Sequence, residues 1–260
     1  MIEGVLFDYG NTLLKYCDFS IGAYAKRIEA AMRAFADAAR QTGLAANWLA
    51  PNGLAPSVFD PGAVGQAVLR DVLAIEARAR RELFEFDLSA AILRALAARF
   101  PEIDETWDTR LDTAVFGVMR RELHPRDDAV PMLRALKNAG FKTAIVSNTQ
   151  FRSANHLADL RRDGMLEWLD ATVFSIDVGV RKPRPEIFQA ALDALGLAPS
   201  QAVFVGDSIE HDILAARRMG MRTILIRTPD NAALAGHQAD AIIDDLSEIP
   251  ALHMVESRME

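Results

Sequence analysis

Cysteine is almost absent from this sequence, and long apolar runs are missing altogether. The 260 residues include one cysteine, Cys17, so no internal disulfide can form and a reducing compartment is expected. Because no histidine lies near Cys17 in the sequence, we interpret it as a small apolar filler rather than a thiol nucleophile. No apolar run approaches the roughly 18 residues of a membrane span, and the N-terminus lacks the basic and apolar regions of a signal peptide. We therefore expect a cytoplasmic protein without a membrane partner.

Positive charge is also scarce. The chain has 29 Lys and Arg against 36 Asp and Glu, which gives a net charge of −7 and argues against a nucleic-acid partner. The one arginine cluster, residues 77–86, contains glutamates and is predicted to be a solvated helix face. Only five of the 29 basic residues are lysines. A lysine flanked by arginines, Lys182 in RKPR, therefore indicates that a compact point charge is required there.

The sequence does contain a regular alternation of strand-like and helix-like segments. Six apolar segments are predicted strands: 3–8, 141–147, 170–175, 201–207, 221–227 and 239–244. Amphipathic segments among them are predicted helices: 129–140, 185–196 and 212–220. This order is typical of a parallel sheet whose right-handed crossovers place helices on both faces. The predicted fold class is α/β, with a Rossmann-like, doubly wound parallel sheet.

Residues 15–123 interrupt this alternation. Four segments there have helical periodicity: 19–43, 63–86, 88–100 and 108–123. The stretch 47–62 between the first two is rich in proline, glycine and asparagine and is predicted to be a loop. We expect residues 1–14 and 124–260 to form the core, with residues 15–123 inserted as an all-helical domain.

Polar side chains follow several of the predicted strands. They are Asp8 after the first strand, Ser147 and Asn148 after the second, Lys182 in a loop before a helix, Asp207 after the strand 201–207, and Asp212 in the next helical turn. In an open parallel sheet, ligands bind outside the carboxyl ends of the strands. We therefore expect these side chains to line one crevice.

The chemistry of this set indicates phosphoryl transfer. Three carboxylates in one crevice repel one another unless a cation lies among them, and Mg²⁺ is suited to carboxylate, water and substrate oxygens. The ion, the Lys182 ammonium and the Ser147 hydroxyl would stabilise the charge of a transferring phosphoryl group. One aspartate could then attack phosphorus and form an aspartyl-phosphate.

The motifs FDYGNTL, VSNT, RKPRPEIF and VGDSIEHDILAARRMGM together resemble those of the haloacid dehalogenase superfamily, most of whose members are phosphatases. The resemblance covers residues 1–14 and 124–246 closely, and the insert is similar to the helical cap of that superfamily in position and helical character only. It implies Asp8 as the nucleophile, Ser147, Asn148 and Lys182 as phosphate binders, and Asp8, the Gly10 carbonyl and Asp207 as Mg²⁺ ligands. It also implies that Thr12 supports the site, that Asp212 supports the metal or Lys182, and that the cap closes as a lid.

The sequence departs from this resemblance at Gly10. Phosphatases of the superfamily carry a second aspartate at that position, which protonates the leaving group and then activates water. A general acid or base contributes a factor of about 10²–10⁴. The substrate could instead have a good leaving group, such as an acyl or aryl phosphate, or another residue could act. The candidates are Lys15, Tyr16, Asp18, Tyr24, Lys26 and His124.

Other functions stay open at this point. Phosphonoacetaldehyde hydrolases resemble this family, also lack that aspartate, and use a cap lysine to form a Schiff base, for which Lys15 or Lys26 is available. Dehalogenases have Tyr-Gly-Thr after the nucleophile, but Tyr9 is one residue out of register with that pattern. A binding protein that has lost activity and a phosphotransferase are further alternatives. The sequence predicts a small phosphorylated substrate without identifying it, and it does not indicate an oligomeric state.

Overall fold

The computed structural model describes the chain except for residues 16–19, 42–60, 102, 232–238, 253–254 and 256–260. Tyr16, Cys17, Asp18 and nearly all of the predicted loop 47–62 therefore lie outside the described residues. The chain divides into two compact units. The first consists of Met1–Cys17, Leu83–Glu85 and His124–Glu260, and the second of Asp18–Glu82 and Phe86–Leu123. Leu83–Glu85 thus belongs to the first unit, although its position in the sequence is in the middle of the insert.

The first unit is built on a six-stranded sheet in the order β3-β2-β1-β4-β5-β6. All five pairings are parallel. The strands are β1 Gly4–Phe7, β2 Lys142–Ser147, β3 Ala171–Phe174, β4 Ala202–Gly206, β5 Arg222–Ile226 and β6 Ala241–Ile243. Each strand lies within a predicted one, and the predicted α/β class is confirmed.

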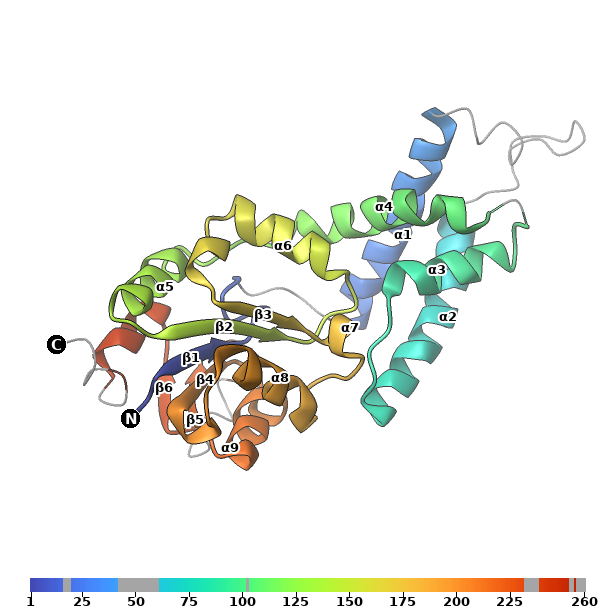
Figure 1. Ribbon diagram of the computed structural model, residues 1–260. Coiled ribbons are helices and arrows are strands. Elements are labelled where there is room, and N and C mark those ends of the chain that lie inside the picture. The colour runs from blue at the N-terminus through green and yellow to red at the C-terminus, as the bar shows by residue number, and fades with distance from the viewer. Residues whose placement is uncertain (16–19, 42–60, 102, 232–238, 253–254, 256–260) are drawn as a thin grey trace, which may run out of the picture. The chain divides into compact units, whose positions relative to one another are not determined.

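Helices lie on both faces of this sheet. They are α5 Ala129–Asn138, α6 Ser153–Arg162, α7 Ser175–Val178, α8 Pro185–Leu195 and α9 Ala215–Met219. In Figure 1, α6 lies over one face near β2 and β3, whereas α8 and α9 lie under the other. Alternate strand residues such as Leu6, Val146 and Phe204 pack with α8 and α9 into one buried cluster, as the two-residue repeat of a strand requires.

Helix α6 is absent from the sequence prediction, and its composition explains why. Its buried residues are His156, Asp159 and Leu160, so two of the three positions that pack inward are polar. A helix of this kind has no apolar stripe for periodicity analysis to detect.

The strand order places a topological switch point at β1. Its neighbours are β2 and β4. Strand β3 lies beyond β2 on one side, and β5 and β6 lie beyond β4 on the other. A crevice opens at the carboxyl ends of strands at such a point. All four residues of β1 are buried, so the strand delivers the next residue, Asp8, from the centre of the sheet to this edge.

The second unit is helical, as its periodicity predicts. Its helices are α1 Ile21–Gln41, α2 Pro61–Glu82, α3 Leu88–Ala97 and α4 Asp108–Arg120. Phe35 of α1 and Trp107, just before α4, meet with ring centroids 5.5 Å apart. The Ser89 hydroxyl donates a 2.8 Å hydrogen bond to the Asp112 carboxylate in the same core, so this buried polar pair is satisfied.

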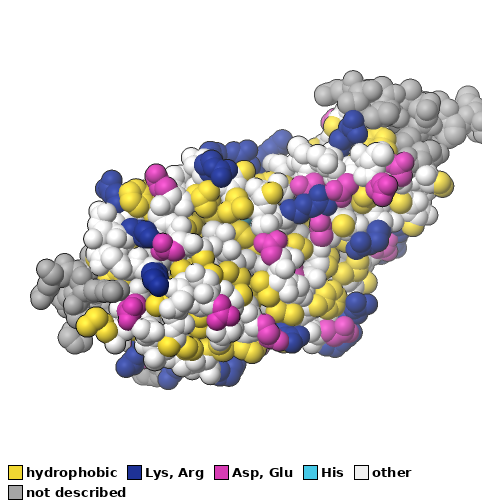
Figure 2. All heavy atoms as spheres, viewed as in Figure 1, with side chains coloured by type: hydrophobic (Ala, Val, Ile, Leu, Met, Phe, Trp, Pro, Cys, Tyr) yellow, Lys and Arg dark blue, Asp and Glu magenta, His cyan; other side chains and the backbone are white. Residues whose placement is uncertain are grey.

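The surface carries charges of both signs. On the face shown in Figure 2, the described basic and acidic side chains are interspersed with apolar ones. No helix within the described part of the chain combines the length and the apolarity needed to cross a membrane.

Candidate active site

Asp8, Lys182 and Asp212 meet at the carboxyl edge of the sheet. The Lys182 ammonium lies 2.7 Å from Asp8 Oδ1 and 2.6 Å from Asp212 Oδ1. The exposed fraction is 8% for Asp8, 2% for Lys182 and 1% for Asp212. One buried cation thus bridges two buried carboxylates, which satisfies it but leaves an excess of negative charge.

Asp207 adds a third carboxylate to this excess of negative charge. Carboxylate oxygens of Asp8, Asp207 and Asp212 all lie within 4.8 Å of one another. Burial raises the pKa of Asp8 to about 6, against the attraction of Lys182. Burial, and after it the charges of Asp8 and Asp212, raises the pKa of Asp207 to about 8. Three clustered oxygen donors whose ionised forms repel one another fit a hard divalent cation such as Mg²⁺.

Lys182 stays charged in this environment. Burial by itself lowers the pKa of an ammonium, but the carboxylates of Asp212 and Asp8 outweigh it and hold the pKa of Lys182 above its ordinary value. The ammonium also lies 5.3 Å from the centroid of the Phe204 ring, a favourable cation–π distance. The lysine of the RKPR sequence thus carries a positive charge into the carboxylate cluster.

Asp212 is held by the turn that follows β4. Residues Ile209–Leu214 form a π-helical turn, a local irregularity frequent at functional sites. Asp212 Oδ2 accepts a 3.0 Å hydrogen bond from the Ser208 main chain. A Cβ atom at Gly206 would lie 2.5 Å from both Cβ and Cγ of Asp212, so the carboxylate occupies space that only glycine leaves open.

Asn148 joins the loop after β2 to residues 179–184, the loop between α7 and α8 that carries Lys182 and is called the lysine loop below. Its side-chain amide accepts from the Lys182 main-chain N–H at 2.7 Å and donates to the Lys182 carbonyl at 3.1 Å. This two-point clamp orients the lysine backbone, whereas phosphate binding by Asn148 stays a prediction. The neighbouring Ser147 hydroxyl is buried at the end of β2 and lies 3.4 Å from the Asn148 carbonyl.

The turn after Asp8 holds the two remaining predicted residues. The Thr12 hydroxyl donates to Asp8 Oδ2 at 3.4 Å, so the second carboxylate oxygen also has a partner. Asn11 adopts a φ of 59°, a left-handed conformation that asparagine tolerates better than most residues. Gly10 lies in this turn and is partly exposed.

The candidate substitutes for an acid at position 10 lie in different places. Lys15 is exposed and forms a 3.1 Å ion pair with Asp127, and its main chain donates to the His124 carbonyl. Tyr24 and Lys26 lie on α1 in the second unit. Tyr16 and Asp18 lie outside the described residues.

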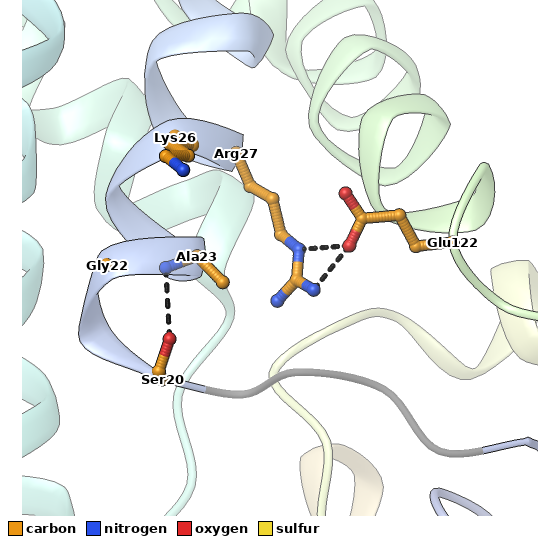
Figure 3. Close-up of a pocket in the computed structure, with 6 residues that line it drawn as sticks. All are labelled: Ser20, Gly22, Ala23, Lys26, Arg27 and Glu122. Carbon is orange, nitrogen blue, oxygen red and sulfur yellow. Dashed lines mark hydrogen bonds and ion pairs between the residues drawn. The ribbon is translucent and has the colours of Figure 1, made fainter.

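A cavity of about 310 Å³ lies entirely within the second unit. Its lining residues are Ser20, Gly22, Ala23, Lys26, Arg27 and Glu122. Figure 3 shows the Arg27 guanidinium directed at the Glu122 carboxylate, with Nε at 2.8 Å. None of the motif residues lines this cavity, and its one buried cation is already paired with a carboxylate. The chemistry therefore points to the carboxylate cluster rather than to this cavity.

Sequence reasoning missed two residues that shape the site. Gly206 belongs to the VGDS motif, but its clearance for Asp212 becomes visible only in three dimensions. Asn231 is buried and donates to the carbonyls of Asp207 and Ile226 at 2.8 and 2.9 Å. It anchors the main chain of a predicted metal ligand, and no motif marks it.

Comparisons with known proteins agree with this geometry. A family model described as haloacid dehalogenase-like hydrolase matches residues 2–220. The chain is 39% identical over 105 residues to a glyceraldehyde 3-phosphate phosphatase from Methanopyrus kandleri, which covers 40% of this chain and 44% of that protein. It is 32% identical over 179 residues to a (S)-2-haloacid dehalogenase from a Pseudomonas strain, which covers 61% of this chain and 75% of that protein.

A solved structure of a 2-haloacid dehalogenase from Pseudomonas syringae has the same fold, with a TM-score of 0.63, 24% sequence identity and full coverage of both chains. The chain matches 44%, 58% and 62% of the length of three relatives named as phosphatases, which is less than two thirds in each case. The family model therefore establishes the family, and the reaction is left to be argued from the site.

The raised pKa of Asp207 leads to a pH-dependent effect of Mg²⁺ on stability. Without metal, the folded protein keeps a proton that the unfolded chain releases above about pH 4, so stability falls as the pH rises toward 8. Mg²⁺ binds the ionised form. We expect Mg²⁺ to raise the melting temperature by a few degrees more at pH 8.5 than at pH 6. For a protein of this size, a shift of about 2–4 °C corresponds to 1 kcal/mol of stability. Thermal melts of wild type and Asp207→Asn measure this; an equal Mg²⁺ effect at both pH values, or an unchanged effect in the variant, contradicts it.

Gly206→Ala tests the clearance for Asp212. The added methyl group would overlap the Asp212 side chain, so the carboxylate must move away from Lys182, Asp8 and Asp207. We expect at least a tenfold loss of Mg²⁺ affinity by calorimetry, comparable to other losses of metal-orienting groups. Gly117→Ala, at a glycine where a Cβ meets nothing within 4 Å, is the matched control. Unchanged Mg²⁺ binding by Gly206→Ala would show that Asp212 does not depend on this space.

Proposed function

We propose that this chain, which belongs to the haloacid dehalogenase-like hydrolase family, is a Mg²⁺-dependent phosphatase that acts on a small phosphorylated metabolite through a phosphorylated Asp8. The observation that carries the proposal is the gathering of three carboxylates within 4.8 Å around a buried ammonium 2.7 Å from Asp8. With a divalent cation among the carboxylates, this cluster would suit a phosphoryl group held next to Lys182. The phosphatase names of several relatives support the same reaction.

Asp8 is the proposed nucleophile because it sits at the end of the central strand with each of its oxygens oriented. Lys182 contacts one oxygen and Thr12 the other. In the first step an Asp8 oxygen bonds to phosphorus as the bond from phosphorus to the leaving oxygen breaks. Water then attacks phosphorus and the bond to Asp8 breaks, which restores the Asp8 carboxylate and releases inorganic phosphate that carries the water's proton.

Lys182 and Ser147 are the proposed phosphate binders. The Lys182 ammonium is held in place through two carboxylates and the Asn148 clamp on its main chain, so its position is set before substrate arrives. Ser147 is the last residue of β2, the strand next to β1. Asp8, Asp207 and the Gly10 carbonyl would hold Mg²⁺, with Asp212 in support. When bound, Mg²⁺ would neutralise phosphoryl oxygens and lower the repulsion that opposes attack by a carboxylate.

The glycine at position 10 limits the choice of substrate. An alkoxide leaving group needs a proton in the transition state, and a glycine has none to give. Acyl and aryl phosphates leave as stable anions and do not need this proton. We therefore propose a substrate with a good leaving group, unless a residue beyond this turn donates the proton.

Dehalogenation is the second candidate, since a haloacid dehalogenase is matched over 75% of its length. It also uses a carboxylate nucleophile and a leaving group that needs no proton. However, three clustered carboxylates repel the anionic haloacid unless a cation is bound, and the dehalogenases that this family resembles need no metal. Chloride release from 2-chloropropionate that persists in EDTA would favour dehalogenation over the proposed phosphatase.

Asp8→Asn tests the nucleophile. The amide keeps the shape of the side chain but cannot attack phosphorus, so we expect p-nitrophenyl phosphate hydrolysis in Mg²⁺ to fall by at least about 10³-fold, as removal of a nucleophile does. Steady-state rates and a trapped phosphoenzyme from a radiolabelled acyl phosphate measure this. Circular dichroism serves as the control for folding. Phosphatase activity near the wild-type value in a folded variant would remove Asp8 from this role.

Gly10→Asp tests the missing acid. An aspartate there should raise kcat/KM for an alkyl phosphate by about tenfold or more, because general acid catalysis contributes about 10²–10⁴. The gain on p-nitrophenyl phosphate should be smaller, since that leaving group needs less help. Gly10→Asn, which has the same size but no acid, is the matched control. Equal rates for all three proteins on the alkyl phosphate would mean that another group already donates the proton.

A further inference from the structure

Three residues of the insert form part of the first unit. Leu83–Glu85 connects α2 to α3 and runs antiparallel to residues 179–181 of the lysine loop, with a bridge between Phe84 and Val180. The Glu85 main chain donates to the Gly179 carbonyl at 3.0 Å, and the Arg181 main chain donates to the Leu83 carbonyl at 3.3 Å. The segment thus pairs with the chain directly before Lys182.

Glu85 brings a buried charge to this pairing. Its side chain has no exposed surface, and that of Arg181 is 10% exposed. The Arg181 guanidinium donates to the two Glu85 oxygens at 2.7 and 3.2 Å, which is the bidentate geometry of a strong pair. The Ser175 hydroxyl donates to Glu85 Oε2 at 2.6 Å. The Glu85 carboxylate therefore accepts three hydrogen bonds from two side chains, Arg181 and Ser175.

Through these donors Glu85 reaches both loops that carry the proposed phosphate binders. Arg181 precedes Lys182 in the chain. Ser175 accepts a 2.8 Å hydrogen bond from the Thr149 main chain, and Thr149 follows Ser147 by two residues. The Asn148 clamp joins the same two loops one step nearer the site. The two loops are thus fastened to each other at Asn148 and fastened jointly to Glu85.

We propose that Glu85 is a positioning residue contributed by the helical insert, which sets the spacing between Lys182 and Ser147 so that both meet one phosphate group. This inference rests on the proposed phosphatase function. Glu85 does not touch substrate; it acts through Arg181 and Ser175. The insert would therefore contribute to phosphate binding through Glu85, which supports residues 179–181 directly before Lys182.

The deciding experiment separates positioning from simple stability. Removing one partner of a buried ion pair leaves an unpaired charge, whereas apolar residues of similar volume in both places are often tolerated. The Glu85→Met/Arg181→Met double variant removes both charges. We expect it to melt near the wild-type temperature and yet to bind inorganic phosphate at least tenfold more weakly in Mg²⁺, measured by calorimetry and by competitive inhibition.

Ser175→Ala is the second variant and covers the case in which the double variant does not fold. It removes only the link from Glu85 through the Ser175 hydroxyl to the Thr149 main chain. We expect inorganic phosphate to bind several-fold more weakly. Asp170→Asn is the matched control, because Asp170 pairs with Lys137 and accepts from the Thr143 main chain at the amino end of β2. It should lower the melting temperature without changing phosphate affinity.

The outcomes distinguish the two proposals. Wild-type phosphate affinity in the folded double variant, or in Ser175→Ala, overturns the role of Glu85 and leaves the phosphatase intact. A wild-type protein that neither binds phosphate nor hydrolyses phosphate esters in Mg²⁺ overturns the proposed function and this inference with it. Weakened phosphate binding in the two variants but not in Asp170→Asn supports Glu85 as a positioning residue.

Discussion

Repulsion among carboxylates is the constraint on which the rest of the site depends. Asp8, Asp207 and Asp212 offer oxygens within 4.8 Å of one another, and within the described residues the ammonium of Lys182 is the cation in contact with them. Burial, and after it the charges of the neighbouring carboxylates, raises the pKa of Asp207 to about 8, and burial raises that of Asp8 to about 6 against the attraction of Lys182. A cluster that resists its own ionisation is costly to a fold unless a cation is bound there. The destabilising cluster is nevertheless present in the fold, as expected of a site that binds a divalent ion.

The fold meets this constraint with local devices that have no other evident use. Gly206 leaves space for the Asp212 side chain, and a π-helical turn directs that side chain back at Lys182. Asn231 holds the main chain of Asp207, and Asn148 holds that of Lys182. Each device either leaves space for a side chain of the cluster or holds the main chain next to one. Rigid support of this kind keeps a charged cluster in a productive geometry.

The fold and the charged residues of the site could be predicted from the sequence, but the contacts that hold these residues in place could not. Continuous apolar strands ending in Asp8 and Asp207 are strong signals, because strand periodicity and a terminal carboxylate lie within a few residues of each other. The α6 helix gave no such signal, since His156 and Asp159 pack inward. The Glu85–Arg181 pair joins residues 96 positions apart. Arg181 begins the RKPRPEIF motif, but no motif contains Glu85 and none indicates this pairing. Contacts that depend on where two distant loops fold together leave no local pattern to read.

Position 10 is where the two candidate reactions come closest to each other. A halide and a stabilised oxyanion both leave without a proton, so Gly10 alone is compatible with either. The charge of the cluster separates them. Both substrates are anions, and Asp207 and Asp212 oppose an anion near Asp8 unless a divalent cation is present. A phosphoryl group can share its oxygens with that cation, and its transition state gains from the contact. A carbon–halogen bond has no such oxygen at the reacting centre, so a metal would stabilise the bound acid without helping the bond to break. The acidic cluster therefore favours phosphorus over carbon as the atom that the proposed nucleophile, Asp8, would attack.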